Sequence, residues 1–363
     1  MSLLESLFGG GARGLIGLDI SSSSVKLLEL ARRGSQYAVE SFALEPLPPG
    51  VVADKQIIDP AVVGQAVTRA VERAGTRTRQ AAVAVAGSAV ITKPIAMPAG
   101  LDDNALEEQI KAEADQYLPY PIDEVALDFQ VAGAGRSAGD NATVEVLLAA
   151  CRKEQVENRL AALEIAGLTP AVVDVEACAL ENACQFLRHQ MPDGGRERTI
   201  AVVDMGASTT SVLVLLDGKP VYTRDQAFGG KQLTEDIMRY YDLSLPEAGK
   251  AKRSGTLPET YFSELLPHFF DDMSQQIDRS FQYYFASAAG GRQIDQVILA
   301  GGCAQIEGVE AQLQQRLQRP TVVARPLAQM AVASRARPQH LAKEEPSLLI
   351  ALGLAFRAFD EES

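Results

Sequence analysis

Short apolar runs separated by polar turns recur along the chain and alternate with longer amphipathic segments. The first runs predict strands over 14–19, 24–31 and 36–43. A helix is expected over 58–74, where apolar positions recur every three or four residues. The apolar run 80–86 is typical of a strand buried on both faces. This order of elements is typical of an α/β protein.

The segment from about 88 to 152 interrupts this order and has the pattern of a small inserted unit. A strand is predicted over 91–97, followed by a helix that begins at Asp102 or Asp103 and runs to about Leu118. Pro119 and Pro121 stop that helix, because proline lacks a backbone donor and clashes with the preceding turn. The unit ends with predicted strands over 124–131 and 143–151, on either side of a glycine-rich loop at 133–139.

The polar, turn-rich segment 191–198 separates two halves of similar plan. We therefore divide the chain into a first half (1–190), a second half (191–345) and a closing C-terminal helix (346–363) that we expect to pack on the first half. The remaining helices are predicted over 153–166, 176–188, 230–241, 245–252, 257–289, 309–319 and 347–359, and the remaining strands over 170–175, 199–204, 211–216, 219–224, 296–299 and 321–324.

The amino-acid composition limits the kinds of binding partner that can be expected for this chain. The net charge is −13 and no block of Lys and Arg reaches five residues, so nucleic acid is disfavoured, because phosphate binding needs a concentrated basic face. The four cysteines form no Cys-x-x-Cys pair and the three histidines lie far apart, which favours a reduced cytosolic protein without structural zinc. No apolar run approaches the roughly 18 residues that span a bilayer. A leader with Leu3, Leu4, Leu7 and Phe8 is expected to fray, the alternative being a short amphipathic anchor.

The main chemical feature is a duplicated hairpin, in which an apolar strand ends in aspartate and a turn of small residues follows. Such turns let backbone amides approach phosphate oxygens, and their hydroxyl groups add donors. The two aspartates would face one cleft and hold Mg²⁺ largely through its water shell. Lys26 lies where it could reach a β-phosphate, the alternative being an exposed strand lysine. The hairpins contain Asp19 with Ser21, Ser22 and Ser23, and Asp204 with Gly206, Ala207, Ser208 and Thr209.

Glycine turns in the second half add to this pattern. Gly301 and Gly302 follow an apolar strand, where a flat adenine or a ribose could lie against backbone, although an ordinary strand-to-helix turn has the same residues. Gly229, Gly230 and Lys231 begin a helix whose N-terminus suits a phosphate or a ribose. On the next helix, Glu247 and Lys250 share a face and could bind ribose hydroxyls or form a surface ion pair.

The order of these motifs resembles the actin-like ATPase superfamily over almost the whole chain. The resemblance implies an α/β fold of duplicated halves around a cleft for ATP or ADP with Mg²⁺. It assigns the first hairpin to the phosphate-1 motif, the second to phosphate-2, and Gly301-Gly302 to the adenosine motif. Asp19, Asp204 and Glu176 would then be the catalytic residues, with Glu176 positioning the attacking water. Relatives have proline after that glutamate, whereas this chain has Ala177, which implies weak or absent hydrolysis. The alternative role of Glu176 is a helix-start acid favoured by the helix dipole.

A narrower resemblance links the chain to the PilM family of type IV pilus assembly proteins. The segment 113–124 is similar to the FtsA-like small subdomain of that family, and 18–30, 81–100, 147–154 and 228–233 are also similar. The resemblance implies pilus assembly and twitching motility at the cytoplasmic face of the inner membrane, with possible oligomers. It implies as partners the N-terminal peptide of PilN, docked between the core and the inserted unit near 90–97 and 117–121, and other inner-membrane and motor proteins.

Two other functions use the same fold. A sugar-kinase-like phosphotransferase would need a further base beside the second hairpin, and no Asp or His is evident there. An FtsA-like division protein would be expected to end in an amphipathic membrane helix, whereas this sequence ends in a short acidic segment.

Overall fold

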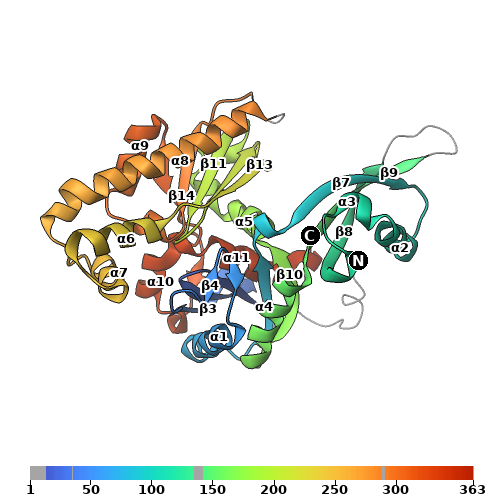
Figure 1. Ribbon diagram of the computed structural model, residues 1–363, viewed down its shortest axis with the longest axis horizontal. Helices are drawn as coiled ribbons and strands as arrows, with labels where there is room; N and C mark the ends of the chain where they lie inside the picture. The colour runs from blue at the N-terminus through green and yellow to red at the C-terminus, as the bar shows by residue number, and fades with distance from the viewer. Residues whose placement is uncertain (1–13, 35, 135–141, 288–290, 363) are drawn as a thin grey trace.

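The computed structural model describes residues 14–34, 36–134, 142–287 and 291–362. It contains two large sheets, one in each half, and a smaller third sheet that projects to one side (Figure 1). The predicted leader at Leu3–Phe8, the loop residues 135–139, and residues 288 and 289 of a predicted helix lie outside the described residues. Within the described part of the chain, no helix has the length and apolar character needed to cross a membrane.

The sheet of the first half has six strands in the order β10-β6-β1-β2-β3-β16. β1, β2 and β3 form an antiparallel meander, while β6 and β10 run parallel beside β1, as the buried apolar run of β6 predicts. One face packs against helices α1 and α4, and the opposite face against α5 and α11. The elements are β1 (Ile16–Ile20), β2 (Ser24–Arg33), β3 (Gln36–Pro46), β6 (Gln80–Val85), β10 (Thr169–Val175), β16 (Ala331–Val332), α1 (Pro60–Ala74), α4 (Lys153–Ile165), α5 (Glu176–Cys184) and α11 (Leu349–Phe356).

The sheet of the second half has five strands in the order β13-β12-β11-β14-β15. Its outer face is covered by α6, α8 and α9, and its inner face packs on the same core as α5 and α11. Those two helices therefore form a central layer between the sheets, which explains why α11 is buried from Leu349 to Ala355. The elements are β11 (Thr199–Met205), β12 (Thr210–Leu216), β13 (Lys219–Gln226), β14 (Gln296–Ala300), β15 (Thr321–Val323), α6 (Gly230–Tyr241), α7 (Leu245–Ser254), α8 (Leu266–Ala286), α9 (Val309–Leu317) and α10 (Pro338–Glu344).

The inserted unit forms its own three-stranded sheet, β7-β9-β8, with a separate small core beneath α2. Asp102 caps α2 by accepting a hydrogen bond from the Ala105 N–H, as expected for a helix that begins at Asp103. The single predicted helix to Leu118 is wrong, because α2 ends at Ala112 and a short α3 follows. The Glu113 backbone leaves helical geometry there, and its carboxylate accepts from Tyr117 and Gln109. The elements are β7 (Ile91–Pro98), α2 (Asp103–Ala112), α3 (Ala114–Tyr117), β8 (Val125–Ala134) and β9 (Thr143–Arg152).

Other elements differ in detail from the sequence prediction. The helix expected over 176–188 leaves α geometry after Cys184 and continues as 3₁₀ turns. A π-helical segment, Tyr261–Leu265, precedes α8, next to Pro267, which cannot donate a backbone hydrogen bond. A small hairpin of β4 (Val52–Ala53) and β5 (Gln56–Ile57) was not predicted, nor were α10 and β16.

Candidate functional site

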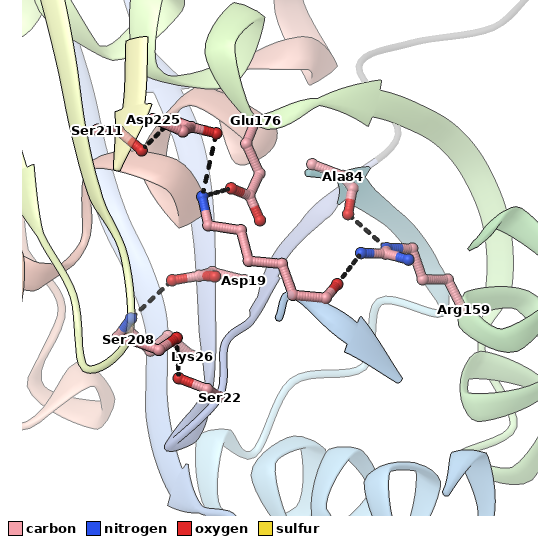
Figure 2. A network of polar contacts seen from close by, with 10 residues as sticks. Asp19, Ser22, Lys26, Ala84, Arg159, Glu176, Ser208, Ser211 and Asp225 are labelled. Atoms are coloured by element: carbon pink, nitrogen blue, oxygen red, sulfur yellow. Dashed lines mark hydrogen bonds and ion pairs between the residues drawn. The ribbon is translucent and has the colours of Figure 1, made fainter. Parts of the chain in front are cut away.

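The turns of the two aspartate hairpins meet where the halves face each other. The hydroxyl oxygens of Ser22 and Ser208 lie 3.1 Å apart, although their turns connect strands of different sheets (Figure 2). The turns also close in the same way: the Ser21 N–H donates to the Ser24 carbonyl at 3.0 Å, and the Gly206 N–H to the Thr209 carbonyl at 2.9 Å. The duplication that the sequence shows is therefore a paired arrangement in space.

Asp19 and Lys26 form a close ion pair in the first hairpin. They are opposite each other in the β1–β2 register, and Lys26 Nζ lies 2.6 Å from Asp19 Oδ2. Both side chains are largely buried, so Lys26 is not the exposed strand lysine of the alternative reading. Its contact with a β-phosphate stays a prediction, and in this structure its ammonium holds the first aspartate.

Asp204 occupies the corresponding position near the end of β11, where it is partly buried. Burial raises the pKa of the Asp204 carboxyl to about 6, and the charge of Lys26 opposes this rise. Gly301 makes room for that carboxylate, because a Cβ at Gly301 would lie 2.4 Å from Asp204 Oδ1. Gly301 also has a φ of 84°, a left-handed conformation that favours glycine. The Gly-Gly turn and the second aspartate are thus packed as one unit.

The start of α6 packs directly under the second hairpin. The Gly230 N–H donates to the Gly206 carbonyl at 3.0 Å, and the Lys231 N–H to the Ala207 carbonyl at 2.7 Å. A Cβ at Gly229 would lie 2.6 Å from both of those carbonyl oxygens. The helix start therefore holds the turn in place with these two N–H groups. Its contribution to phosphate binding stays a prediction, as does that of Gly302 to adenine.

On α7, the lysine that points inward is Lys252. Its Nζ donates to the Gly230 carbonyl at 2.7 Å and to Thr234 Oγ1 at 2.5 Å. Glu247 is exposed and accepts hydrogen bonds from the Ser244 N–H and hydroxyl at the start of α7, and Lys250 is exposed. Helical periodicity contained a signal for Lys252, because it follows the buried Ala248 by four residues.

A second ionic cluster lies around Glu176, at the start of α5. Lys55 Nζ lies 2.5 Å from Glu176 Oε2 and 3.8 Å from Asp225 Oδ2. Asp225 comes from β13 and accepts a hydrogen bond from Ser211 at 2.6 Å (Figure 2). The charges of Glu176 and Asp19 also act on Asp204, so the two clusters share one electrostatic environment. Lys55 and Asp225 were not among the site residues predicted from the sequence.

In a comparison with known protein families, the family described as type IV pilus assembly protein PilM matches residues 17–359 of this chain. The chain belongs to the PilM family. A solved PilM–PilN type IV pilus biogenesis complex aligns with a TM-score of 0.78 at 30% identity, over 95% of this chain and 98% of that chain. The family resemblance and the actin-like fold expected from the sequence are both confirmed.

Two further relatives are ethanolamine utilization proteins named EutJ. The structure from Carboxydothermus hydrogenoformans aligns with a TM-score of 0.55 at 19% identity, over 94% of this chain and 88% of that chain, which shows a shared fold. The EutJ protein of Salmonella typhimurium is 30% identical over 115 residues, or 32% of this chain. That match spans 37% of the length of this relative.

As a member of the PilM family, the chain combines paired aspartate hairpins with an inserted unit. The junction of its two halves brings together four carboxylates, of Asp19, Asp204, Glu176 and Asp225, and two ammonium groups, of Lys26 and Lys55. Negative charge therefore exceeds positive charge by two among these groups, and by one when the Arg159 guanidinium, whose charge also acts on Glu176, is counted. Such an excess suits a divalent cation, provided that the cation completes its coordination with water and ligand oxygens. Among the described residues, no group of three or more His, Cys, Asp or Glu side chains could hold a metal by itself.

Proposed function

We propose that this PilM-family protein binds Mg-ATP or Mg-ADP between its two halves and serves as a nucleotide-dependent assembly protein of the type IV pilus inner-membrane complex. The observation that carries the nucleotide proposal is the 3.1 Å contact between Ser22 and Ser208. It brings together two turns of small residues, each following a strand that carries an aspartate. Small polar turns of this kind surround a polyphosphate with amide and hydroxyl donors.

Asp19 and Asp204 are the residues that would hold Mg²⁺, through its bound waters. The excess of carboxylates around the hairpins and the partial burial of Asp204 support this assignment, because a carboxylate with restricted access to water gains most from a nearby cation. When bound, the cation would neutralise charge on the phosphate oxygens. The chain itself contributes the two carboxylates, the turn hydroxyls and the ammonium of Lys26.

We propose that hydrolysis is slow or absent. Glu176 is the residue expected to orient an attacking water, yet its carboxylate is engaged by Lys55 at 2.5 Å. A carboxylate held by an ammonium is a weaker acceptor for a water proton. Ala177, in place of the proline expected in relatives, points in the same direction.

The nucleotide site is tested by Asp204→Asn. We expect the affinity for Mg-ATP to fall by at least about tenfold, because the amide carries no charge toward the hydrated cation. Titration calorimetry measures this loss, and Asp217→Asn, in an exposed turn of the same half, serves as a control. Unchanged affinity in Asp204→Asn would overturn the assigned role.

Asp204→Asn is also expected to change the free energy of unfolding of the ligand-free protein, in a way that depends on pH. The pKa of Asp204 is raised from 3.8 to about 6, so its contribution to stability is full below pH 4 and is lost as the pH rises through 6. Asparagine avoids that loss, and we expect Asp204→Asn to be more stable than the parent by about 2–3 kcal/mol above pH 6 and equal to it below pH 4. Thermal unfolding at pH 4 and pH 7.5 separates the two conditions.

The proposed partner is the N-terminal cytoplasmic peptide of PilN. The PilM–PilN complex among the structural relatives supports this proposal, since it aligns over nearly the whole chain. Binding to PilN would bring the protein to the cytoplasmic face of the inner membrane, where contacts with motor proteins and twitching motility would follow. β10 is an edge strand that lies beside the inserted unit, and it exposes Val173 by 38% (Figure 1). An open strand edge with an apolar side chain suits an extended peptide.

Pull-down with a synthetic PilN N-terminal peptide, with and without Mg-ATP, tests this partner. We expect retention of the peptide by the parent protein and a loss of at least about tenfold in Val173→Asp, because a charge would be desolvated at the strand edge. Ile58→Asp, at an exposed site away from β10, is expected to bind like the parent. Failure of the parent to bind in both conditions would refute the peptide proposal while the nucleotide proposal stands.

A further inference from the structure

The β4–β5 hairpin holds a lysine in a conformation that lysine rarely adopts. Its two turn residues, Asp54 and Lys55, have φ values of 47° and 60°. Glycine and asparagine are the usual residues at such positions, because other side chains crowd the backbone there. Strain of this kind persists where the surrounding structure requires a particular side chain. The turn therefore raises the question of what Lys55 does.

Arg159 holds this turn in place through hydrogen bonds to backbone carbonyls. Arg159 is 1% exposed, and its guanidinium donates to three backbone carbonyls: Lys55 at 3.2 Å, Ala84 at 2.5 Å and Gln155 at 2.7 Å. These carbonyls belong to the hairpin, to β6 and to α4 itself. Figure 2 shows Arg159 reaching Ala84 from α4. The hairpin is thus tied to the sheet of the first half, and the backbone of Lys55 has little freedom.

The side chain of Lys55 extends from this fixed point to carboxylates of both halves. Its Nζ contacts Glu176, at the start of α5 in the first half, and lies 3.8 Å from Asp225, on β13 in the second half. The Ser211 hydroxyl donates a hydrogen bond to the other carboxylate oxygen of Asp225, Oδ1. All three ionic side chains are less than a fifth exposed, so solvent screens their charges weakly.

We propose that Lys55 is a latch between the two halves, which keeps the cleft closed by holding Glu176 and Asp225 on one ammonium group. Without that ammonium, two carboxylates from opposite halves would face each other, and like charges in a partly buried site repel. The removal of Lys55 therefore converts an attraction across the cleft into a repulsion. By holding Glu176, Lys55 also positions the carboxylate that is expected to orient the attacking water, and this second role rests on the proposed nucleotide function.

The latch is tested by the distance between spin labels at Glu72→Cys on α1 and Glu259→Cys just before the π-helical segment, both exposed. All labelled variants also carry Cys178→Ser, which removes an unwanted labelling site, since Cys178 is exposed and the other three cysteines are buried. In Lys55→Met we expect a second, longer distance, with the open population raised by about tenfold. Lys343→Met makes the same charge change at an exposed site and is expected to resemble the parent.

Two further comparisons make the result decisive. Adding Glu176→Gln to Lys55→Met removes the repulsion, so the closed population should return, which a purely structural role of Lys55 would not produce. In a chase experiment, a fluorescent ATP analogue should leave Lys55→Met about tenfold faster than the parent. Identical distance distributions for Lys55→Met and Lys343→Met would overturn the latch. If no variant binds the analogue, the nucleotide proposal fails and the distances still decide the latch.

Discussion

Replacing Gly353 by alanine is expected to lower the free energy of unfolding by about 3 kcal/mol or more. A Cβ at Gly353 would lie 1.8 Å from the Ala179 carbonyl oxygen and 2.6 Å from its carbon. These are backbone atoms of α5, so no flexible side chain can move aside. The helix α11 would have to shift away from α5, although it is buried between both sheets. Urea unfolding of the parent and the variant measures the change.

Gly249→Ala is the matched control for Gly353→Ala. Both glycines lie inside helices, where alanine is favoured over glycine by about 1 kcal/mol. A Cβ at Gly249 would meet only the end of the Arg253 side chain, at 3.5 Å. We therefore expect opposite signs: stabilisation in Gly249→Ala and destabilisation in Gly353→Ala. Stabilisation of both variants would show that α11 can move from α5 without cost, contrary to the packing argument.

The two aspartate hairpins could be predicted because the information for them is local. Each one is an apolar strand, a turn of small residues and a second apolar strand within a short segment, and the antiparallel registers follow from that spacing. Their meeting in space could be inferred from the duplication, since equivalent ends of two similar halves face one cleft. The contact between Ser22 and Ser208 is the geometry that this inference requires.

Lys55 and Asp225 could not be predicted in the same way, because their roles depend on distant partners. The sequence around Lys55 shows three polar residues between apolar ones, but Asp-Lys lacks the Asn-Gly or Asp-Gly chemistry that marks a tight hairpin. Glu176 and Arg159, the residues that explain the position of Lys55, lie more than a hundred residues away. Asp225 lies on a strand of mixed polarity, where nothing distinguishes it from a solvent-facing acid.

The central helix layer links the closing helix to the candidate site. α5 begins with Glu176, and α11 packs against α5 through Gly353 and against β1 through Gly17, where a Cβ would lie 2.1 Å from the Ala351 carbonyl oxygen. β1 in turn carries Asp19 near its end. Close backbone packing therefore sets the spacing between Glu176 and Asp19. Side-chain chemistry in the cleft depends on glycine contacts that the pattern of polar residues does not reveal.

Gly301→Ala is expected to abolish measurable nucleotide binding and to lower the free energy of unfolding by about 2–4 kcal/mol. At a φ of 84°, alanine is strained, and its Cβ would lie 2.4 Å from both Asp204 Oδ1 and the Met205 carbonyl oxygen. The second hairpin must then move, and with it the Asp204 carboxylate. The adjacent Gly302 has no atom within 4 Å of an added Cβ, so Gly302→Ala should unfold like the parent. Calorimetry with Mg-ATP and urea unfolding of both variants would contradict this account if Gly301→Ala kept the affinity and stability of the parent.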